Sequence, residues 1–319
     1  MIIDFLTASY KDYTGMGIKP TDFDEFWDKA KSEVDDLPLT YELEKVDIPS
    51  QVAEFYYLKF KGVGGATLVC QLIKPLKKQP KHPGMLMFHG YHGSSGDFVD
   101  KLSWVAEGYI VMAMDCRGQG GLSEDVTVAN GTTLKGHIIR GVEDGPENLY
   151  FRSVFLDTYQ CAKILASFAD VDEQQLVTSG GSQGGALALV CAALYPEIKK
   201  TLAIYPFLSD YRKLFQLDIG VTATAYEELH YWFRQRDPLH KREAEFFDTL
   251  EYIDIQHLVE RIKASVIWPI GLADAITPPA TQFAVYNRLE CPKEMIIFPE
   301  YGHDHLPGLN DQVRAFFLK

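Results

Sequence analysis

Residues 176–185 read Leu-Val-Thr-Ser-Gly-Gly-Ser-Gln-Gly-Gly, and this stretch decides the fold. Its first four residues suit a buried strand, whereas the Ala- and Leu-rich run up to Leu194 is typical of a helix. Between them lies the pattern Gly-x-Ser-x-Gly with Ser182 at its centre. A serine on so sharp a turn needs small neighbours, because larger side chains would collide with the strand or the helix. The stretch therefore predicts a nucleophile elbow that presents Ser182 at a helix N-terminus.

The rhythm of apolar runs after Pro83 indicates a mostly parallel sheet. Short apolar runs occupy residues 84–88, 109–114, 175–179, 200–204, 264–271 and 294–298. Helical stretches between them include residues 97–107, 151–168 and 184–194. Because the short runs are continuously apolar rather than alternating, they suit strands that are buried on both faces. We therefore expect helices on both faces of the sheet, and the elbow then predicts an α/β-hydrolase fold.

The remaining segments are interpreted as additions to one α/β-hydrolase domain that spans residues 1–319. Residues 1–80 are expected to form an N-terminal extension, with a helix opened by Asp22–Trp27 and a hairpin over residues 54–73. Residues 205–262 interrupt the rhythm of the sheet with a polar, aromatic and helical sequence. Such an insertion between strands usually forms a lid or a partner surface.

Composition excludes several classes of partner. Lys and Arg total 31 against 44 Asp and Glu, a formal net charge of −13, which repels phosphate backbones and anionic lipid. No apolar run reaches the roughly 18 residues of a membrane-spanning helix, and the N-terminus lacks the pattern of a signal peptide. The 5 scattered cysteines indicate unpaired thiols in a reducing compartment. We expect a cytoplasmic protein with no nucleic-acid or membrane partner.

The serine predicts two further catalytic residues. A serine hydroxyl is a weak nucleophile that needs a base, and the base needs a carboxylate to orient it. In this fold the order along the chain is Ser, acid, His, with each residue on a loop after a strand. Asp274 follows the run 264–271, and His303 follows the run 294–298. We therefore predict that Ser182, Asp274 and His303 are the catalytic residues.

Other residues compete for these roles. His305 is a rival base, but Gly302 favours His303 because it permits close approach of the chain. The two neighbouring histidines also suggest zinc, yet a third ligand has no spacing signal, so no metal and no organic cofactor is expected. Asp210 and Asp254 are weaker candidates for the acid, since neither directly ends a strong strand near the C-terminus.

Acyl transfer also needs two N–H donors for the negative oxygen of the tetrahedral intermediate. The backbone of Gln183, next to the nucleophile, is the first expected donor. The second should come from residues 88–93, Phe-His-Gly-Tyr-His-Gly, where the His-Gly-aromatic pattern assigns Tyr91 as the oxyanion and substrate-binding residue. His89 in the same loop is interpreted as a hydrogen-bonded structural histidine.

A third motif is the Gly-rich stretch 115–121. It lacks the spacing of a phosphate-binding loop. Arg117, Gly118 and Gln119 are therefore predicted to be structural residues near the site. The guanidinium of Arg117 is suited to clamping loop carbonyls beside the elbow.

With these motifs, the sequence resembles the acetyl xylan esterase and cephalosporin C deacetylase family, carbohydrate esterase family 7. The resemblance covers nearly the whole chain and rests on Arg117–Gln119, the elbow Gly180–Gly184, and His303-Asp304, where the family has His-Glu. It implies a serine esterase that removes acetyl groups from short xylo-oligosaccharides and from cephalosporin C through an acetyl-enzyme. It also implies a ring-shaped homohexamer.

Two kinds of alternative compete with this interpretation. A serine peptidase or a general carboxylesterase could share the fold, although peptidases of the prolyl oligopeptidase type usually carry a large N-terminal propeller. About 80 residues precede the sheet here, which is too few for a propeller. A catalytically silent binding protein is the second kind, but such proteins commonly lose the serine or the histidine, and here both are present.

Overall fold

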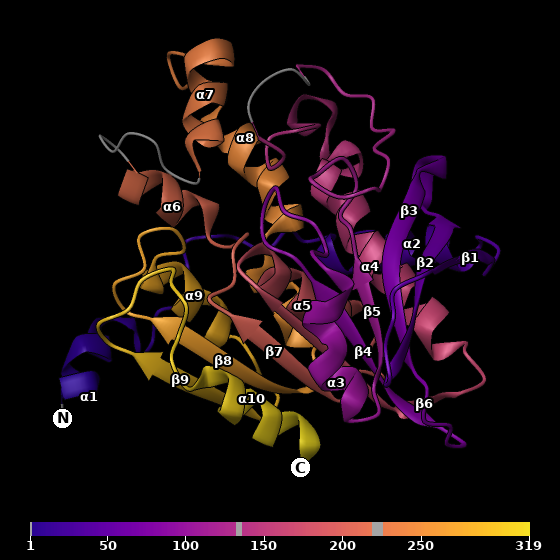
Figure 1. The fold of residues 1–319 in the computed structure, drawn as a ribbon. Coiled ribbons are helices and arrows are strands. Elements are labelled where there is room, and N and C mark those ends of the chain that lie inside the picture. Colours follow the sequence, from indigo (N-terminus) through magenta and orange to yellow (C-terminus); the bar gives the residue numbers. More distant parts are fainter. Residues whose placement is uncertain (1, 132–135, 219–225) are drawn as a thin grey trace.

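A single mixed sheet organises the protein, seen in a computed structural model that describes residues 2–131, 136–218 and 226–319 (Figure 1). In these residues nine strands are hydrogen-bonded in the order β1-β2-β3-β5-β4-β6-β7-β8-β9. Their bounds are β1 Tyr41–Val46, β2 Ala53–Lys61, β3 Thr67–Pro75, β4 His82–Phe88, β5 Ile110–Met114, β6 Val171–Gly181, β7 Lys200–Ile204, β8 Ser265–Gly271 and β9 Lys293–Phe298.

The predicted parallel sheet is confirmed. Strands β4 to β9 pair with one another in parallel, and each coincides with one of the apolar runs after Pro83. The predicted hairpin is β2 and β3, which pair antiparallel, and β3 joins the parallel set through β5. Strand β1 was not predicted, because five of its six side chains are exposed and leave no apolar pattern to detect.

Helices cover the sheet. The α-helices of the described residues are α1 Ile2–Thr7, α2 Phe23–Asp35, α3 Leu102–Ala106, α4 Tyr150–Ala166, α5 Gln183–Leu194, α6 Tyr211–Asp218, α7 Glu227–Arg236, α8 Glu243–Leu250, α9 Pro279–Tyr286 and α10 Leu309–Leu318. Short 3-10 helices occur at Ala8–Tyr10, Val63–Gly65, Phe98–Lys101, Val142–Asp144, Pro146–Asn148, Glu251–Ile253, Ile255–His257 and Val259–Arg261.

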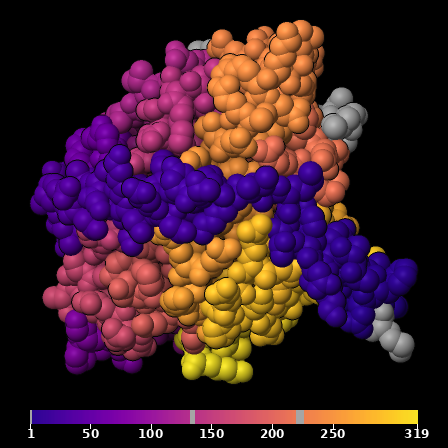
Figure 2. Space-filling model, turned by 180° about the vertical axis from the view of Figure 1, so that it is seen from behind, coloured from indigo at the N-terminus to yellow at the C-terminus, as the bar shows by residue number. Residues whose placement is uncertain are grey.

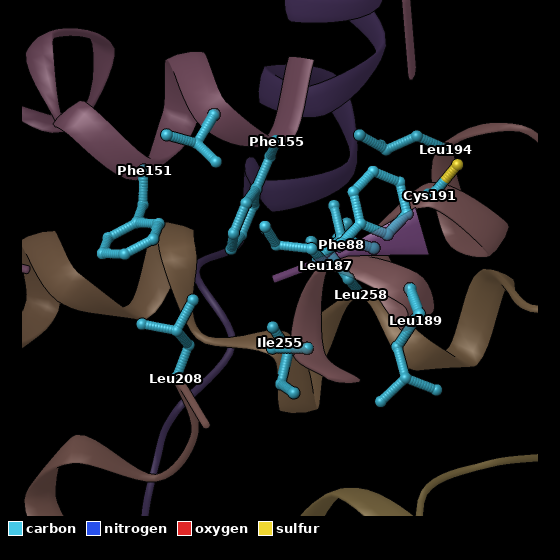
Figure 3. Packing of buried hydrophobic residues seen from close by; sticks show 14 of the residues in the cluster. Phe88, Phe151, Phe155, Leu187, Leu189, Cys191, Leu194, Leu208, Ile255 and Leu258 are labelled. Atoms are coloured by element: carbon cyan, nitrogen blue, oxygen red, sulfur yellow. The ribbon is translucent and has the colours of Figure 1, made fainter. Parts of the chain in front are cut away.

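Two hydrophobic cores lie on opposite faces of the sheet, as expected for strands buried on both sides. In β5, Ile110 and Met112 belong to the larger core, and Val111 between them belongs to the smaller one. Helices α2, α4 and α5 supply the larger core, whereas α3 and α10 supply the smaller. Figure 3 shows Phe151 and Phe155 of α4 facing the side chains of α5 across the larger core. Burial of this apolar surface holds the layers together.

The N-terminal segment runs as a band across one face of the molecule, seen from behind in Figure 2. It is tied to residues 205–262: Tyr13 Oη donates to Asp210 Oδ2 at 2.6 Å, and Trp27 Nε1 donates to the carbonyl of Tyr252 at 3.0 Å. Figure 1 shows α7, from the same stretch, projecting far from the sheet. Among the described residues, no helix is long and apolar enough to cross a membrane.

Candidate active site

Ser182 sits on a strained turn between β6 and α5. Its backbone has φ 57° and ψ −122°, a conformation that L residues rarely adopt and that usually marks a functional turn. A Cβ on Gly180 would lie 2.2 Å from the carbonyl carbon of Gly184, and a Cβ on Gly184 would lie 2.0 Å from the carbonyl oxygen of Phe88. The turn therefore forms only with glycine at these two positions. The Ser182 N–H donates to the carbonyl of Ile204 at 2.9 Å, which secures the turn to β7.

Asp274 and His303 meet where β8 and β9 end. Their loops are joined by a hydrogen bond of 2.9 Å from Ala273 N–H to the carbonyl of Tyr301. Asp274 Oδ2 lies 2.8 Å from His303 Nδ1, and the side chain of Asp274 is fully buried while that of His303 is 21% exposed. A carboxylate in this position holds the proton on Nδ1, so that Nε2 of the imidazole can accept a proton from a nucleophile.

Thr277 completes the surroundings of the acid, and the sequence did not single it out. Its hydroxyl donates to Asp274 Oδ2 at 2.8 Å, and its N–H donates to Oδ1 at 2.8 Å. The N–H of Ile276 also donates to Oδ1 at 2.8 Å. Together these donors fix the carboxylate opposite the imidazole. The only local signal was the spacing of a threonine three residues after an aspartate, which is common in ordinary turns.

Tyr205, at the end of β7, links the elbow to the histidine. Its ring centroid lies 4.2 Å from that of His303. On the other side, a Cβ on Gly181 would lie 3.7 Å from Tyr205 Cε2. The elbow with Ser182 and the loop with His303 therefore border one aromatic ring, at the edge of the sheet where the parallel strands end.

The loop after β4 passes beside the nucleophile. A Cβ on Gly90 would lie 4.0 Å from Ser182 Cβ, so Tyr91 follows directly on a residue that touches the elbow. Gln183 is fully buried and is the first residue of α5. The N–H groups in the first turn of a helix have no acceptor within the helix, which leaves them available for a developing negative charge.

Gln119 joins this loop to the start of α5. Its Nε2 donates to Gln183 Oε1 at 2.8 Å, and its Oε1 accepts from the N–H of His92 at 2.9 Å. Gly118 before it has φ +62°, and a Cβ there would lie 2.7 Å from Asp125 Cβ. The turn around Gly118 thus aims Gln119 at the two segments from which the oxyanion donors are expected.

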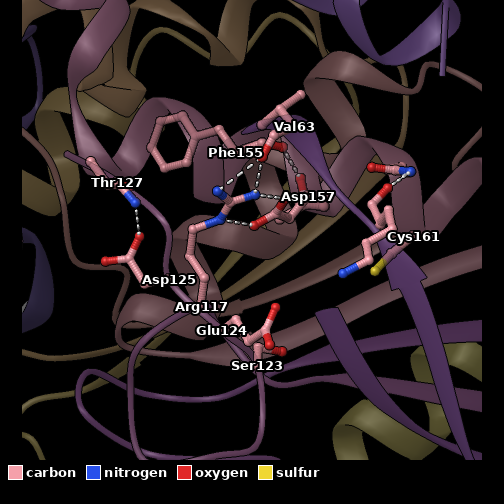
Figure 4. A network of polar contacts seen from close by, with 12 residues as sticks. Val63, Arg117, Ser123, Glu124, Asp125, Thr127, Phe155, Asp157 and Cys161 are labelled. Atoms are coloured by element: carbon pink, nitrogen blue, oxygen red, sulfur yellow. Dashed lines mark hydrogen bonds and ion pairs between the residues drawn. The ribbon is translucent and has the colours of Figure 1, made fainter. Parts of the chain in front are cut away.

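Arg117 differs from its expected role of clamping loop carbonyls beside the elbow. Its main partner is the carboxylate of Asp157 on α4, with Nε to Oδ2 at 2.7 Å and Nη2 to Oδ1 at 2.6 Å (Figure 4). Both side chains are buried, 1% and 0% exposed. The single carbonyl that it reaches is that of Val63, at 3.3 Å, between β2 and β3. Burial requires a full counter-charge for the guanidinium, and α4 supplies it.

The rival residues have other surroundings. His305 is exposed, whereas Asp274 pairs with His303. Asp210 binds the N-terminal segment, and Asp254 accepts from the N–H of Gln256 at 3.1 Å in a short helix. In the described part of the chain, no group of three or more His, Cys, Asp or Glu is placed to hold a metal ion.

His89 is confirmed as a structural histidine. Its Nε2 accepts from the N–H of Cys116 at 2.9 Å, so the proton resides on Nδ1, which donates to the carbonyl of Gly90 at 2.8 Å. Burial lowers the pKa of His89. The neutral imidazole therefore braces the loop that leads to Tyr91.

The fold and this arrangement define a class: an α/β hydrolase with a serine on its nucleophile elbow and a His–Asp pair beside it. The model of the family described as acetyl xylan esterase (AXE1) matches residues 1–319. The chain belongs to the acetyl xylan esterase family, which classes it as a carboxylic ester hydrolase.

Three relatives illustrate the similarity. Acetyl xylan esterase 1 from Thermoanaerobacterium sp. JW/SL YS485 is 45% identical, with a TM-score of 0.94 over 98% of this chain and 97% of that one. An acetyl xylan esterase from Paenibacillus sp. R4 is 32% identical, with a TM-score of 0.92 over 98% of both chains. The acetyl esterase Axe7A of Xylanibacter ruminicola is 28% identical over 307 residues, which are 94% of this chain. The present chain spans only 66% of the length of Axe7A.

Proposed function

We propose that the protein is a serine esterase that removes acetyl groups from acetylated xylo-oligosaccharides. The observation that carries this proposal is the hydrogen bond of 2.8 Å between Asp274 and His303, at the same edge of the sheet as the strained elbow of Ser182. The similarity to acetyl xylan esterases supports acetyl esters as the substrate class. A peptidase or a silent binding protein is not favoured.

In the proposed reaction, Ser182 Oγ attacks the acetyl carbonyl while His303 Nε2 takes the hydroxyl proton. Asp274 stabilises the resulting imidazolium, and the backbone N–H groups of Gln183 and Tyr91 stabilise the oxyanion. His303 then gives the proton to the departing sugar alcohol, which leaves an acetyl-enzyme. Water attacks this ester with His303 as base, and acetate is released as Ser182 regains its proton.

The acyl group is expected to be short. The segment Ile276–Pro279, with two prolines, directly follows the catalytic acid and offers little freedom to widen the site. A methylene that cannot be accommodated costs roughly 1–3 kcal/mol. The kcat/KM for p-nitrophenyl acetate should therefore exceed that for the butyryl ester by at least about tenfold. A rate that rises with acyl length would contradict the acetyl assignment.

The alcohol side of the substrate is tested separately. Acetate release should be measured from acetylated xylo-oligosaccharides and from cephalosporin C, with the Ser182→Ala protein as control. We propose that both alcohols are accepted, as the family resemblance implies. Release from neither, alongside an active p-nitrophenyl acetate assay, would restrict the proposal to a general carboxylesterase.

We also propose a homohexamer in the cytoplasm. The family resemblance supports the hexamer. The location is supported by the cysteines: Cys70, Cys116, Cys161 and Cys191 are buried free thiols, and Cys291 is a partly buried one. Unpaired buried thiols suit a reducing compartment.

A further inference from the structure

The hydroxyl of Tyr91, far from the backbone that is expected to bind the oxyanion, is itself held in a network. It donates to Glu228 Oε1 at 2.7 Å and accepts from the N–H of His137 at 2.6 Å. Glu228 Oε2 accepts from the N–H of Ile138 at 2.7 Å and from that of Ile139 at 3.2 Å. Three consecutive backbone N–H groups thus converge on one phenol and one carboxylate.

Glu228 is the part of this network that comes from the stretch between β7 and β8. It lies on α7, and it is only 2% exposed. A Cβ on Gly136 would lie 2.1 Å from its carboxyl carbon, so the backbone packs directly on the carboxylate. A carboxylate buried this deeply is stable only while its oxygens keep their donors. The contact with Tyr91 is therefore a fixed part of the structure.

The ring of Tyr91 is held at both ends. Its centroid lies 5.1 Å from that of Phe207 and 4.0 Å from that of His92, so aromatic neighbours hold the ring. The hydrogen bond to Glu228 then fixes its far end. Because the ring is rigid and joined to the backbone by two rotatable bonds, both constraints act on the position of the Tyr91 N–H.

We infer that Glu228 is a positioning residue for the oxyanion site, acting through the hydroxyl of Tyr91. In this way helix α7 helps to set the geometry of a donor that is needed only when negative charge develops on the substrate oxygen. The inference rests on the proposed function, in which the Tyr91 N–H binds the oxyanion. Misplacing such a donor by about 1 Å costs about a hundredfold in rate.

The test is Glu228→Gln, assayed with p-nitrophenyl acetate at about pH 8. Glutamine keeps the size of the side chain but replaces one acceptor oxygen by a donor, so it cannot accept from both Tyr91 and the backbone. We expect kcat to fall about 10- to 100-fold with KM changed less than about twofold, because the donor acts in the transition state. Tyr91→Phe should cause a similar fall, and the double variant should be no worse than the worse single variant.

Glu143→Gln is the matched control. Glu143 also ties α7 to the body of the protein, since its carboxylate accepts from Trp232 Nε1 at 2.8 Å and from Arg242 Nη1 at 3.1 Å. It stands outside the network of Tyr91, so its kcat should stay within about twofold of the parent. An equal loss in Glu143→Gln would overturn the inference, since general anchoring of α7 would then explain the effect.

The remaining outcomes separate the two proposals. Unchanged kcat in Glu228→Gln, in a parent enzyme that depends on Ser182, would overturn the role of Glu228 alone. A parent protein without acetylesterase activity would overturn the proposed function. If Glu228→Gln does not fold, Tyr91→Phe decides, because it removes the same hydrogen bond and leaves the carboxylate in place. Unchanged kcat in Tyr91→Phe would then refute the inference.

Discussion

The hydrogen bond between Asp274 and His303 makes a prediction about single residues. Ser182→Ala or His303→Ala should lower kcat by on the order of 10⁶, and the double variant should be little worse, because the three groups act as one unit. Steady-state hydrolysis of p-nitrophenyl acetate measures this effect. His305→Ala is the control, since His305 is exposed two residues beyond His303. Normal activity in folded His303→Ala protein would move the base to His305.

Glu228 also predicts a dependence of stability on pH. Burial raises the pKa of its carboxyl from 4.5 to about 7, although hydrogen bonds from Tyr91 and from the backbone of Ile138 and Ile139 favour the charged form. Between these values the folded protein holds a proton that the unfolded chain has lost. The stabilisation is therefore complete below about pH 4.5 and is lost as the pH rises to about 7.

The measurement is the free energy of unfolding of the parent and of Glu228→Gln in denaturant, at several pH values. The difference, parent minus variant, should fall by roughly 3 kcal/mol as the pH rises through this interval, and should then stay level. A difference independent of pH would show that Glu228 does not titrate there.

At the scale of elements, the junction of β6 and α5 depends on two neighbouring glycines in different ways. A Cβ on Gly184 would strike the carbonyl of Phe88 at 2.0 Å, whereas a Cβ on Gly181 would meet its nearest side chains at 3.7 Å, an ordinary contact. Gly184→Ala should therefore lower the free energy of unfolding by about 3 kcal/mol or more. Gly181→Ala should cost less than about 1 kcal/mol.

Thermal and denaturant unfolding of both variants distinguish these cases. Equal stability of the two proteins would mean that α5 can move away from β4, and that the close packing at the elbow is not required. Activity is a separate readout, because both glycines flank Ser182.

At the scale of the whole molecule, the exposed apolar surface predicts assembly. The edge strand β1 is open to pairing on one side and exposes Tyr41 and Leu43, 37% and 46% accessible. Helix α1 exposes Phe5 at 81%. Multi-angle light scattering at micromolar concentration should give about 216 kDa for six chains of 36.0 kDa each. A single species of one chain's mass would refute the assembly.

Much of the fold follows from short stretches of sequence. Continuous apolar runs predicted strands β4 to β9, because a strand covered on both faces must be apolar at every position. The glycines around Ser182 predicted the elbow, because the steric demand of that turn falls on residues within three positions of it. The order of Ser182, Asp274 and His303 predicted the site, and the structure places the last two in contact.

What the sequence by itself determined is therefore whatever neighbouring residues carry: strand periodicity, the elbow and the order of the candidate catalytic residues. Only the tertiary structure decided which distant elements touch. It paired Arg117 with Asp157 and joined Tyr91 to Glu228, 137 positions away. The physical reason is that such contacts depend on how whole elements pack, and a buried charge shows its partner only after that packing is complete.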